Sequence, residues 1–427
     1  MPNGKVAFLW DESFLWGLMA CKALRADGLP FELMRAEDIR KGALSGRKML
    51  FVPGGWASNK LKALGDNGVD EIRKFVRDGG NYLGFCGGAG LATLDGIGLL
   101  PIKRKPTKER VPSFSGRINL TTSEHPLWRG IADPVFHAWW PSQFIIEDQG
   151  IQVLASYGAA SSDSFSSDLN TGDVADHGSW PEMEQKYRIN LDPRRLVNDP
   201  AVVGGLFGKG RVILSLIHFD TPDDRNGAAA LRNAWDYLAK DSNESQVTSN
   251  AKGSNKLQVT SNKLKTKGES GDSLLSSGLE AAISELVALG ARNFLWFWRN
   301  PMLLQWRRGI RGLEYCTLHV LIREIAGILR ADHSFPGATA SGLSIENSLD
   351  TISKMLLPFL ERAKRLLVLE RLALQSGHIT YERCDDPEIR EIRTELFSHS
   401  KSYGGQFKIL IDEIDMLLYS LLKQQAS

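Results

Sequence analysis

Cysteine is scarce in this chain of 427 residues. The four cysteines, Cys21, Cys86, Cys316 and Cys384, are scattered and form no CxxC pair. Such spacing excludes the common zinc sites and a disulfide framework, and it is typical of a protein of a reducing compartment. We therefore expect no metal, no cofactor and a cytoplasmic location.

The chain also lacks an excess of charge of either sign and a long hydrophobic run. Its formal net charge of +2 and the absence of an arginine-rich arm argue against nucleic acid as a partner. No apolar stretch approaches the ~20 residues of a membrane span, and even residues 293–304 contain an arginine and a proline. Asp11 and Glu12 end the first apolar run too early for a secretory signal. A soluble protein without a membrane span is expected.

The composition divides the chain into three parts. Its length suits two folded units, and 42% hydrophobic with 24% charged residues is ordinary for globular domains. Residues 241–277 are instead rich in Ser, Asn, Lys, Thr and Gly, and they contain one pentapeptide twice, at 246–250 and 258–262. This composition is typical of a flexible low-complexity linker. We predict one domain at 1–240 and a second at 278–427.

Short apolar runs alternate with helical patterns in the first domain. Strands are expected at 5–10, 48–52, 81–85 and 212–217, and helices at 15–27 and 68–78. This alternation predicts an α/β fold with a parallel sheet flanked by helices. Residues 48–52 and 212–217 are apolar on both faces, as central strands of such a sheet are.

The second domain has a different period. From about Leu279 the apolar residues recur at intervals of three and four, which predicts an all-helical bundle. Residues 294–311 are rich in aromatic residues and arginine and are expected to form either a membrane-surface helix or the aromatic core of the bundle. Self-association or the docking of a protein partner is the expected role of this half.

The most informative segment surrounds Cys86. An apolar strand ends at Phe85, and the cysteine follows between Gly84 and the pair Gly87 and Gly88. A sharp strand-to-helix turn of this kind exposes a nucleophile, and flanking glycines avoid clashes there. The following helix N-terminus favours the thiolate form. The alternative is a buried structural cysteine in a glycine-rich turn.

A thiolate nucleophile needs a base, and the base needs an orienting group. His218 and Asp220 directly follow the apolar strand at 212–217. Residues two apart face the same side, and the carboxyl ends of parallel strands share one edge of the sheet, so this pair can meet Cys86. Alternatively, His218 bonds to a backbone carbonyl and Asp220 is a turn residue before Pro222.

A second glycine-rich loop follows the strand at 48–52. Gly54, Gly55 and Trp56 lie in this loop. The backbone amides of Gly55 and Gly87 could together stabilise an oxyanion, with Gly54, Trp56 and Gly88 lining the pocket, although an ordinary turn is the alternative.

Further pocket residues are expected between Cys86 and His218. The aromatic-rich segment 136–144 contains Trp140 and Gln143, which line the pocket unless they are core residues. The polar tract 161–180 is expected to be a long loop, either a lid or a plain surface loop.

Three motifs carry a family resemblance that covers about residues 4–240. The segments 51–55, 84–88 and 208–220 resemble class I glutamine amidotransferase-like domains, in particular the N-terminal domain of eukaryotic-type biotin-protein ligases. The resemblance implies a flavodoxin-like fold, with Cys86 as nucleophile, His218 as base and Asp220 as the acidic partner. Where the family usually has His-Pro-Glu, this chain has His-Phe-Asp. Related domains of the ThiJ/PfpI type place an acidic residue at the position of Asp11 or Glu12.

The remainder of the chain does not resemble the partners of the better-known activities. Residues 278–427 contain neither a recognisable synthetase half nor the Gly-Arg-Gly-Arg type of loop of a biotin ligase. We therefore predict a cysteine-dependent amidase, hydrolase or acyl-transfer enzyme that acts on a small molecule or peptide with an amide-type bond. The alternative is a catalytically silent ligand-binding or scaffold protein, whose helical half mediates association.

Overall fold

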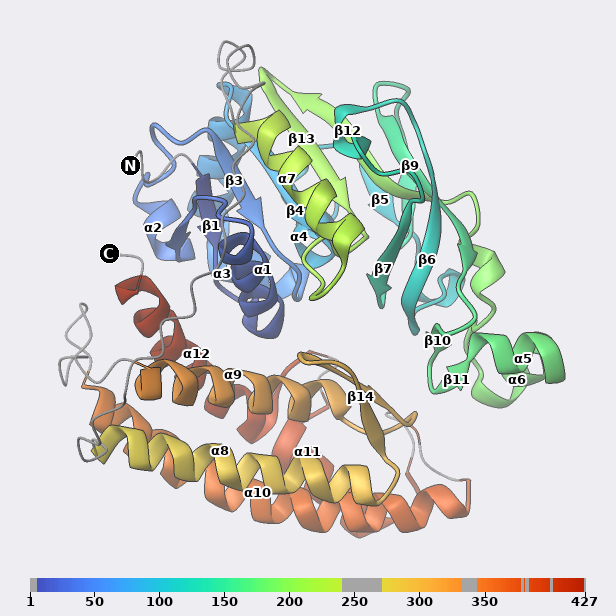
Figure 1. Cartoon of the computed structure of the whole chain (residues 1–427), viewed down its shortest axis with the longest axis vertical. Coiled ribbons are helices and arrows are strands. Elements are labelled where there is room, and N and C mark those ends of the chain that lie inside the picture. Colours follow the sequence, from blue (N-terminus) through green and yellow to red (C-terminus); the bar gives the residue numbers. More distant parts are fainter. Residues whose placement is uncertain are drawn as a thin grey trace, which may run out of the picture.

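The computed structural model describes residues 6–239, 271–331, 344–377, 380, 384–399 and 402–425. Figure 1 shows the α/β domain above and the helices of the second half below, in direct contact with it.

Five parallel strands form one side of the main sheet. In spatial order they are β2 (Glu32–Met34), β1 (Val6–Leu9), β3 (Met49–Val52), β4 (Asn81–Phe85) and β13 (Gly210–Ser215). Every residue of β1 and β3 is buried, because helices cover both faces of these strands. The predicted α/β fold class is confirmed.

Antiparallel strands extend this sheet to eleven strands in all. They are β12 (Pro200–Phe207), β9 (Gln152–Ala160), β6 (Phe114–Thr122), β7 (Val135–Trp139), β10 (Phe165–Ser166) and β11 (Leu169–Asn170). A separate pair contains β5 (Ile102–Arg104) and β8 (Phe144–Ile146). The sheet is thus mixed instead of wholly parallel.

Seven helices belong to the α/β domain within its described residues. They are α1 (Phe14–Ala26), α2 (Ala36–Arg40), α3 (Ala57–Arg77), α4 (Gly87–Leu91), α5 (Thr171–His177), α6 (Trp180–Tyr187) and α7 (Arg225–Ala239). In Figure 1 α7 lies across the parallel strands on the side of the viewer. The tract 161–180, expected as a loop, contains β10, β11 and α5.

The second half contains the predicted bundle. Its helices are α8 (Gly271–Arg292), α9 (Gly312–Ala331), α10 (Ile345–Gln375), α11 (Pro387–Phe397) and α12 (Gly405–Gln424). Because α8 begins at Gly271, residues 271–277 are helical and not part of the linker predicted at 241–277. Residues 241–270 lie outside the described residues.

A β-hairpin interrupts the helical half, where the sequence predicted a helix over 294–311. Its strands are β14 (Trp296–Asn300) and β15 (Leu303–Trp306). Side chains alternate between its two faces. Trp296 is buried in the bundle and donates to the Val287 carbonyl, whereas Phe297 contacts Phe165 of the α/β domain. The aromatic residues of the hairpin therefore pack both in the bundle and against the α/β domain.

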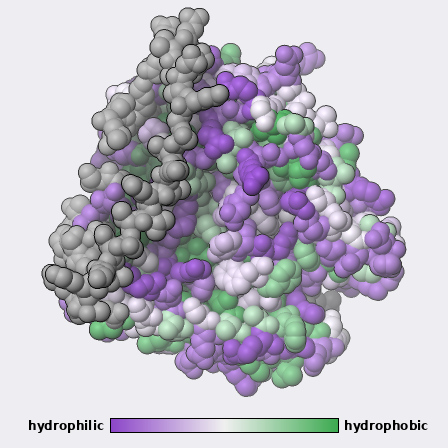
Figure 2. Space-filling view, in the orientation of Figure 1, coloured by the Kyte–Doolittle hydropathy of each residue, from purple (hydrophilic) through white to green (hydrophobic). Residues whose placement is uncertain are grey.

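Helix α8 is long and apolar enough to cross a membrane by length and composition alone, with a hydropathy of 1.4. Core helices of soluble proteins meet the same criterion. In this structure Leu279, Ile283 and Leu286 are buried where α8 packs against α9 and α10. On the face seen in Figure 2, hydrophilic residues alternate with small hydrophobic areas over the helical half.

One hydrophobic core runs through both halves of the molecule. Trp10, at the end of β1, donates its indole N–H to Asp415 of α12 over 2.8 Å. Arg35 contacts the other oxygen of Asp415 at 3.4 Å. Phe14 packs against Tyr403, with ring centroids 5.2 Å apart. The helical half is thus joined to the α/β domain through buried contacts.

We expect the Asp415→Ala variant to lower the free energy of unfolding by about 1–3 kcal/mol, because it leaves the buried indole N–H of Trp10 without an acceptor. Asp415→Asn retains a hydrogen-bond acceptor for Trp10, so its free energy of unfolding should fall by less. The matched control is Asp412→Ala, which removes a half-exposed carboxylate from the same helix. Urea unfolding followed by tryptophan fluorescence measures the three variants. Equal losses for Asp415→Ala and Asp412→Ala would contradict the role of the Trp10 contact.

Candidate active site

Cys86 lies in a strained turn between β4 and α4. Its backbone has φ 47° and ψ −103°, a region that non-glycine residues rarely adopt. Two hydrogen bonds of 2.8 Å hold it there, from its own N–H to the Ser215 carbonyl and from the Gly90 N–H to its carbonyl. Backbone strain of this kind persists only where the surroundings enforce it. The thiol is partly exposed, whereas the other three cysteines are buried.

The glycines around Cys86 permit this turn to pack against the neighbouring strand. A Cβ atom at Gly88 would lie 2.0 Å from the Val52 carbonyl oxygen, and one at Gly87 would lie 1.9 Å from the Gly55 carbonyl oxygen. No side chain fits at either position. The elbow is therefore pressed directly against the loop that follows β3.

His218 and Asp220 meet as predicted. Their Nδ1 and Oδ1 atoms are 3.0 Å apart, and both side chains are fully buried. Strand β13 pairs with β4 in parallel, with Ser215 opposite Phe85, so His218 and Cys86 both follow the carboxyl ends of adjacent strands. The Nε2 atom of His218 has no hydrogen-bond partner among the described residues.

The electrostatics of His218 depend on its two neighbours. Burial lowers the pKa of His218, but the negative charge and hydrogen bond of Asp220, together with Cys86, outweigh this effect and raise the pKa to about 10. Asp220 and Cys86 therefore favour the protonated imidazole, against the neutral form that burial favours.

The segment after β13 is held from the side of β7. The His218 N–H donates to the His137 carbonyl over 2.9 Å, and the Trp139 indole donates to Thr221 over 3.0 Å. Phe219 is buried against Phe85, with ring centroids 5.3 Å apart. Packing of this aromatic ring thus anchors the turn between His218 and Asp220.

The predicted oxyanion residues lie together. The backbones of Gly55 and Gly87 are in contact, and Gly55 has a φ of 117°. Within the described chain, neither amide N–H donates to another backbone group. The role of these two amides as oxyanion donors stays a prediction.

Asp11 and Glu12, which follow β1, form ion pairs with residues other than Cys86. Asp11 lies 3.5 Å from Arg35, and Glu12 lies 3.1 Å from Lys408 of α12. These ion pairs engage both carboxylates at the contact with the helical half. The ThiJ/PfpI type of arrangement with Cys86 is not formed by these contacts.

The remaining pocket candidates differ in position. Gln143 is buried and its Oε1 accepts the Val111 N–H over 2.9 Å, which is a core role. Trp56 directly precedes α3 and is half-buried. Trp140 is also half-buried and stacks on Trp306 of the hairpin, with ring centroids 4.9 Å apart.

Three residues near the site were not predicted. The Trp16 ring lies against His218 at a centroid distance of 4.7 Å, and a Cβ at Gly54 would come within 3.0 Å of Trp16 and 3.2 Å of His218. Trp306 reaches the site from the helical half. Lys60 is completely buried and donates to the Asp11 carbonyl and to Ser13.

Lys60 is unusual because burial lowers its pKa to about 7, against the opposing effect of nearby acidic groups that include Cys86. Lys60 lies on the same face of α3 as the buried residues Ala57 and Leu64. A single lysine at a buried position of the amphipathic pattern of α3 is the signal that would have indicated it.

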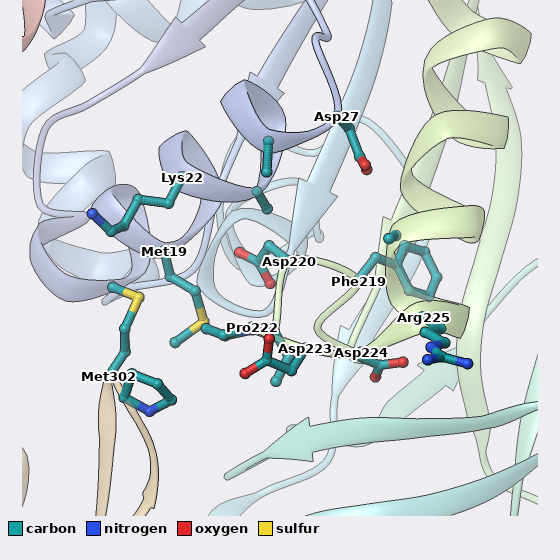
Figure 3. A pocket seen from close by; sticks show the side chains of 15 residues that line it. Met19, Lys22, Asp27, Phe219, Asp220, Pro222, Asp223, Asp224, Arg225 and Met302 are labelled. Carbon is teal, nitrogen blue, oxygen red and sulfur yellow. The ribbon is translucent and has the colours of Figure 1, made fainter. Parts of the chain in front are cut away.

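A pocket of about 590 Å³ is lined by Asp220 and its neighbours Phe219 and Asp223 (Figure 3). It is bounded by α1, by the loop after β13 and by Met302 of the hairpin turn. Asp220 lines it, and its Oδ2 atom is buried without a hydrogen-bond partner in the described part of the chain. The pocket therefore approaches the pair from the carboxylate side and not from Cys86.

Comparison with known proteins identifies the segment that contains the elbow. Residues 44–95 match the family model described as "Biotin-protein ligase, N terminal". This match confirms the predicted resemblance, and it spans the glycine-rich loop at 53–55 together with Cys86. No curated protein matches the chain.

Solved structures resemble the first half of the chain. A structure described as a glutamine amidotransferase is 22% identical, and the match covers 55% of this chain and 99% of that chain with a TM-score of 0.36. A GMP synthase protein from Thermoplasma acidophilum is 14% identical, with 55% and 93% covered and a TM-score of 0.36. A ThuA-like protein from Bacteroides uniformis is 11% identical, with 56% and 93% covered and a TM-score of 0.37. At these values the likenesses carry no argument about activity.

We expect the Gly88→Ala variant to lose about 3 kcal/mol or more of stability, because the added methyl group overlaps the Val52 carbonyl. The matched control is Gly278→Ala in α8, where a Cβ meets no atom within 4 Å. This control should be neutral or gain up to about 1 kcal/mol of stability. Urea midpoints of both variants measure the difference, and a Gly88→Ala variant as stable as the control would refute the close approach.

A second prediction concerns pH. The pKa of His218 is raised from 6.5 to about 10, so its pairing with Asp220 stabilises the fold fully below pH ~6.5 and loses this effect as pH rises toward 10. Asp220→Asn should therefore lower the melting temperature most at pH 6–7 and least near pH 10. The control is Asp223→Asn, because Asp223 is exposed and asparagine tolerates its φ of 62°. A pH-independent loss would contradict the assigned ion pair.

Proposed function

We propose that the chain is a cysteine-dependent amidase, hydrolase or acyl-transfer enzyme of the glutamine amidotransferase-like superfamily. The observation that carries the proposal is the position of His218, whose Nδ1 lies 3.0 Å from Asp220 and whose pKa is raised by both Asp220 and a strained, partly exposed Cys86. A base that is oriented by a carboxylate next to a nucleophile is the arrangement that acyl transfer requires.

The chemistry would proceed in two steps. The Cys86 sulfur attacks the amide carbonyl carbon, and the amides of Gly55 and Gly87 stabilise the oxyanion. The C–N bond breaks as His218 transfers its proton to the leaving nitrogen, which yields a thioester and a free amine. His218 then removes a proton from water, or from an acceptor amine, as this nucleophile attacks the thioester and releases the Cys86 thiolate.

The aromatic rings near the site support this chemistry. Trp16 covers His218, and the stack of Trp140 on Trp306 brings the hairpin of the helical half next to the same region. Apolar walls strengthen the electrostatic interactions among Cys86, His218 and Asp220 by excluding water.

A second candidate function is ligand binding or scaffolding without chemistry. The observation that favours it is three exposed apolar side chains of α10, Leu357, Val368 and Leu372, on the side of the helix that also carries the Glu361–Lys364 ion pair. In that case the helical half would dock a protein partner, and the residues around Cys86 would bind a small molecule or peptide.

Alkylation kinetics separate the two candidates. We expect iodoacetamide to modify Cys86 at pH 7 at least about tenfold faster than the other cysteines, because it is accessible and adjacent to His218. Burial raises the pKa of Cys21 to about 11 and that of Cys316 to about 12, which makes them internal references. Peptide mass spectrometry gives the rate at each cysteine.

The matched variants are His218→Ala and His125→Ala. The first should slow Cys86 alkylation about tenfold because the cation beside the sulfur is lost, and the second should leave the rate unchanged. If Cys86 is no faster than Cys384, or if His218→Ala has no effect on it, the catalytic proposal fails and the binding function is favoured.

A further inference from the structure

Three of the buried polar atoms that lack hydrogen-bond partners in the described part of the chain belong to Arg104, Arg110 and Tyr157. They are the Nε atoms of Arg104 and Arg110 and the hydroxyl of Tyr157. They come from β5, from the loop that follows β5, and from β9. Buried polar groups are normally paired, so an unpaired set marks a place that a ligand or ordered water completes.

Arg104 lies near Cys86, and hydrogen bonds connect the segments that carry Arg110 and Tyr157. Val111, next to Arg110, donates its N–H to Gln143, the Gln143 amide donates to Asp199, and the Tyr157 N–H donates to the Asp199 carbonyl. The Arg104 guanidinium is 3.3 Å from the place that a Cβ of Gly90 would occupy, one turn of α4 after Cys86. Burial and the neighbouring Arg104 lower the pKa of Arg110, whereas negative charge on Cys86 opposes this change. Burial, Cys86 and Asp199 together raise the pKa of Tyr157. The electrostatic effect of Cys86 thus reaches both Arg110 and Tyr157.

Neither arginine has a counterion among the described residues. Arg110 donates only to neutral hydroxyls there, those of Ser142 at 2.9 Å and Thr107 at 2.7 Å. No ion pair of Arg104 or Arg110 is formed in that part of the chain. Asp199, the nearby carboxylate, is already engaged by Lys105 at 2.7 Å. Two adjacent guanidinium groups that repel each other gain most from an anion placed between them.

We propose that Arg104 and Arg110, with the Tyr157 hydroxyl, form a subsite for an oxyanion group of the substrate, a carboxylate or a phosphate. The guanidinium Nε–H groups and the phenol O–H supply the hydrogen bonds that such a group accepts. The inference rests on the proposed function for the reacting bond, which lies at Cys86. It makes Arg104 and Arg110 specificity-determining residues for an anionic substrate.

Charged and neutral alkylating reagents test the subsite in the full-length protein. We expect Arg104→Met and Arg110→Met each to reduce the rate ratio of iodoacetate to iodoacetamide at Cys86 about tenfold, because a cationic site concentrates the anionic reagent. Methionine retains the apolar stem of arginine. The control Lys108→Met removes one positive charge from an exposed position of the same loop and should leave the ratio unchanged.

Equilibrium binding keeps the test independent of cysteine reactivity. Titration calorimetry compares glutarate, inorganic phosphate and the neutral glutaramide. We expect glutarate or phosphate to bind at least about tenfold more tightly than glutaramide, and this preference should be lost in Arg110→Met. The conservative variant Arg110→Lys should retain part of it, because it keeps the charge but not the planar donor group. If glutarate binds more tightly than phosphate, the subsite accepts a carboxylate of the substrate. If phosphate binds more tightly, the subsite accepts a phosphate group.

The outcomes separate this inference from the proposed function. A reactive Cys86 with an unchanged reagent ratio in both arginine variants, and with equal binding of glutarate and glutaramide, overturns the anion subsite and leaves the catalytic proposal intact. An unreactive Cys86 together with anion binding that depends on Arg104 and Arg110 overturns the catalytic proposal and retains the subsite. Variants that fail to melt cooperatively are replaced by Arg104→Lys and Arg110→Lys, for which a smaller reduction in the same ratio is expected.

Discussion

The geometry of the site depends on the close approach of two backbone segments, the elbow at Gly87 and Gly88 and the loop after β3. The separations of 1.9 Å and 2.0 Å between hypothetical Cβ atoms and carbonyl oxygens leave no room for side chains. This approach holds Cys86 at a positive φ and brings the amides of Gly55 and Gly87 together. The nucleophile and the predicted oxyanion donors therefore come from a single packing constraint, imposed by the parallel pairing of β3 with β4.

Electrostatics then select the protonation state of His218. Burial alone would favour the neutral imidazole, and only a fixed Asp220 carboxylate together with Cys86 reverses that preference and raises the pKa. A buried charge pair stabilises little unless its partners are held in place. Here Phe219 and the His137 carbonyl hold the turn, which keeps the Asp220 carboxylate 3.0 Å from the imidazole.

Local pattern was sufficient to predict the helical half, the positions of Cys86 and His218, and four of the five parallel strands. It missed β2, which has only three residues, Glu32–Met34. It was insufficient for the antiparallel extension and for the hairpin at 296–306, where aromatic and arginine residues suggested a helix. Arg104 is a further example of what escaped prediction. It matters only because tertiary packing places β5 beside α4, and no local spacing reports such a contact.

The helical half cannot be regarded as an independent appendage of the α/β domain. Glu12, whose carbonyl oxygen lies against Gly55, forms an ion pair with Lys408 of α12. Trp10 of the same segment donates to Asp415. On the other side of the site, Trp306 stacks on Trp140. Two separate contacts thus join the helical half to residues next to the elbow, so a shift of α12 or of the hairpin would change the surroundings of Cys86 without altering any of the proposed catalytic residues.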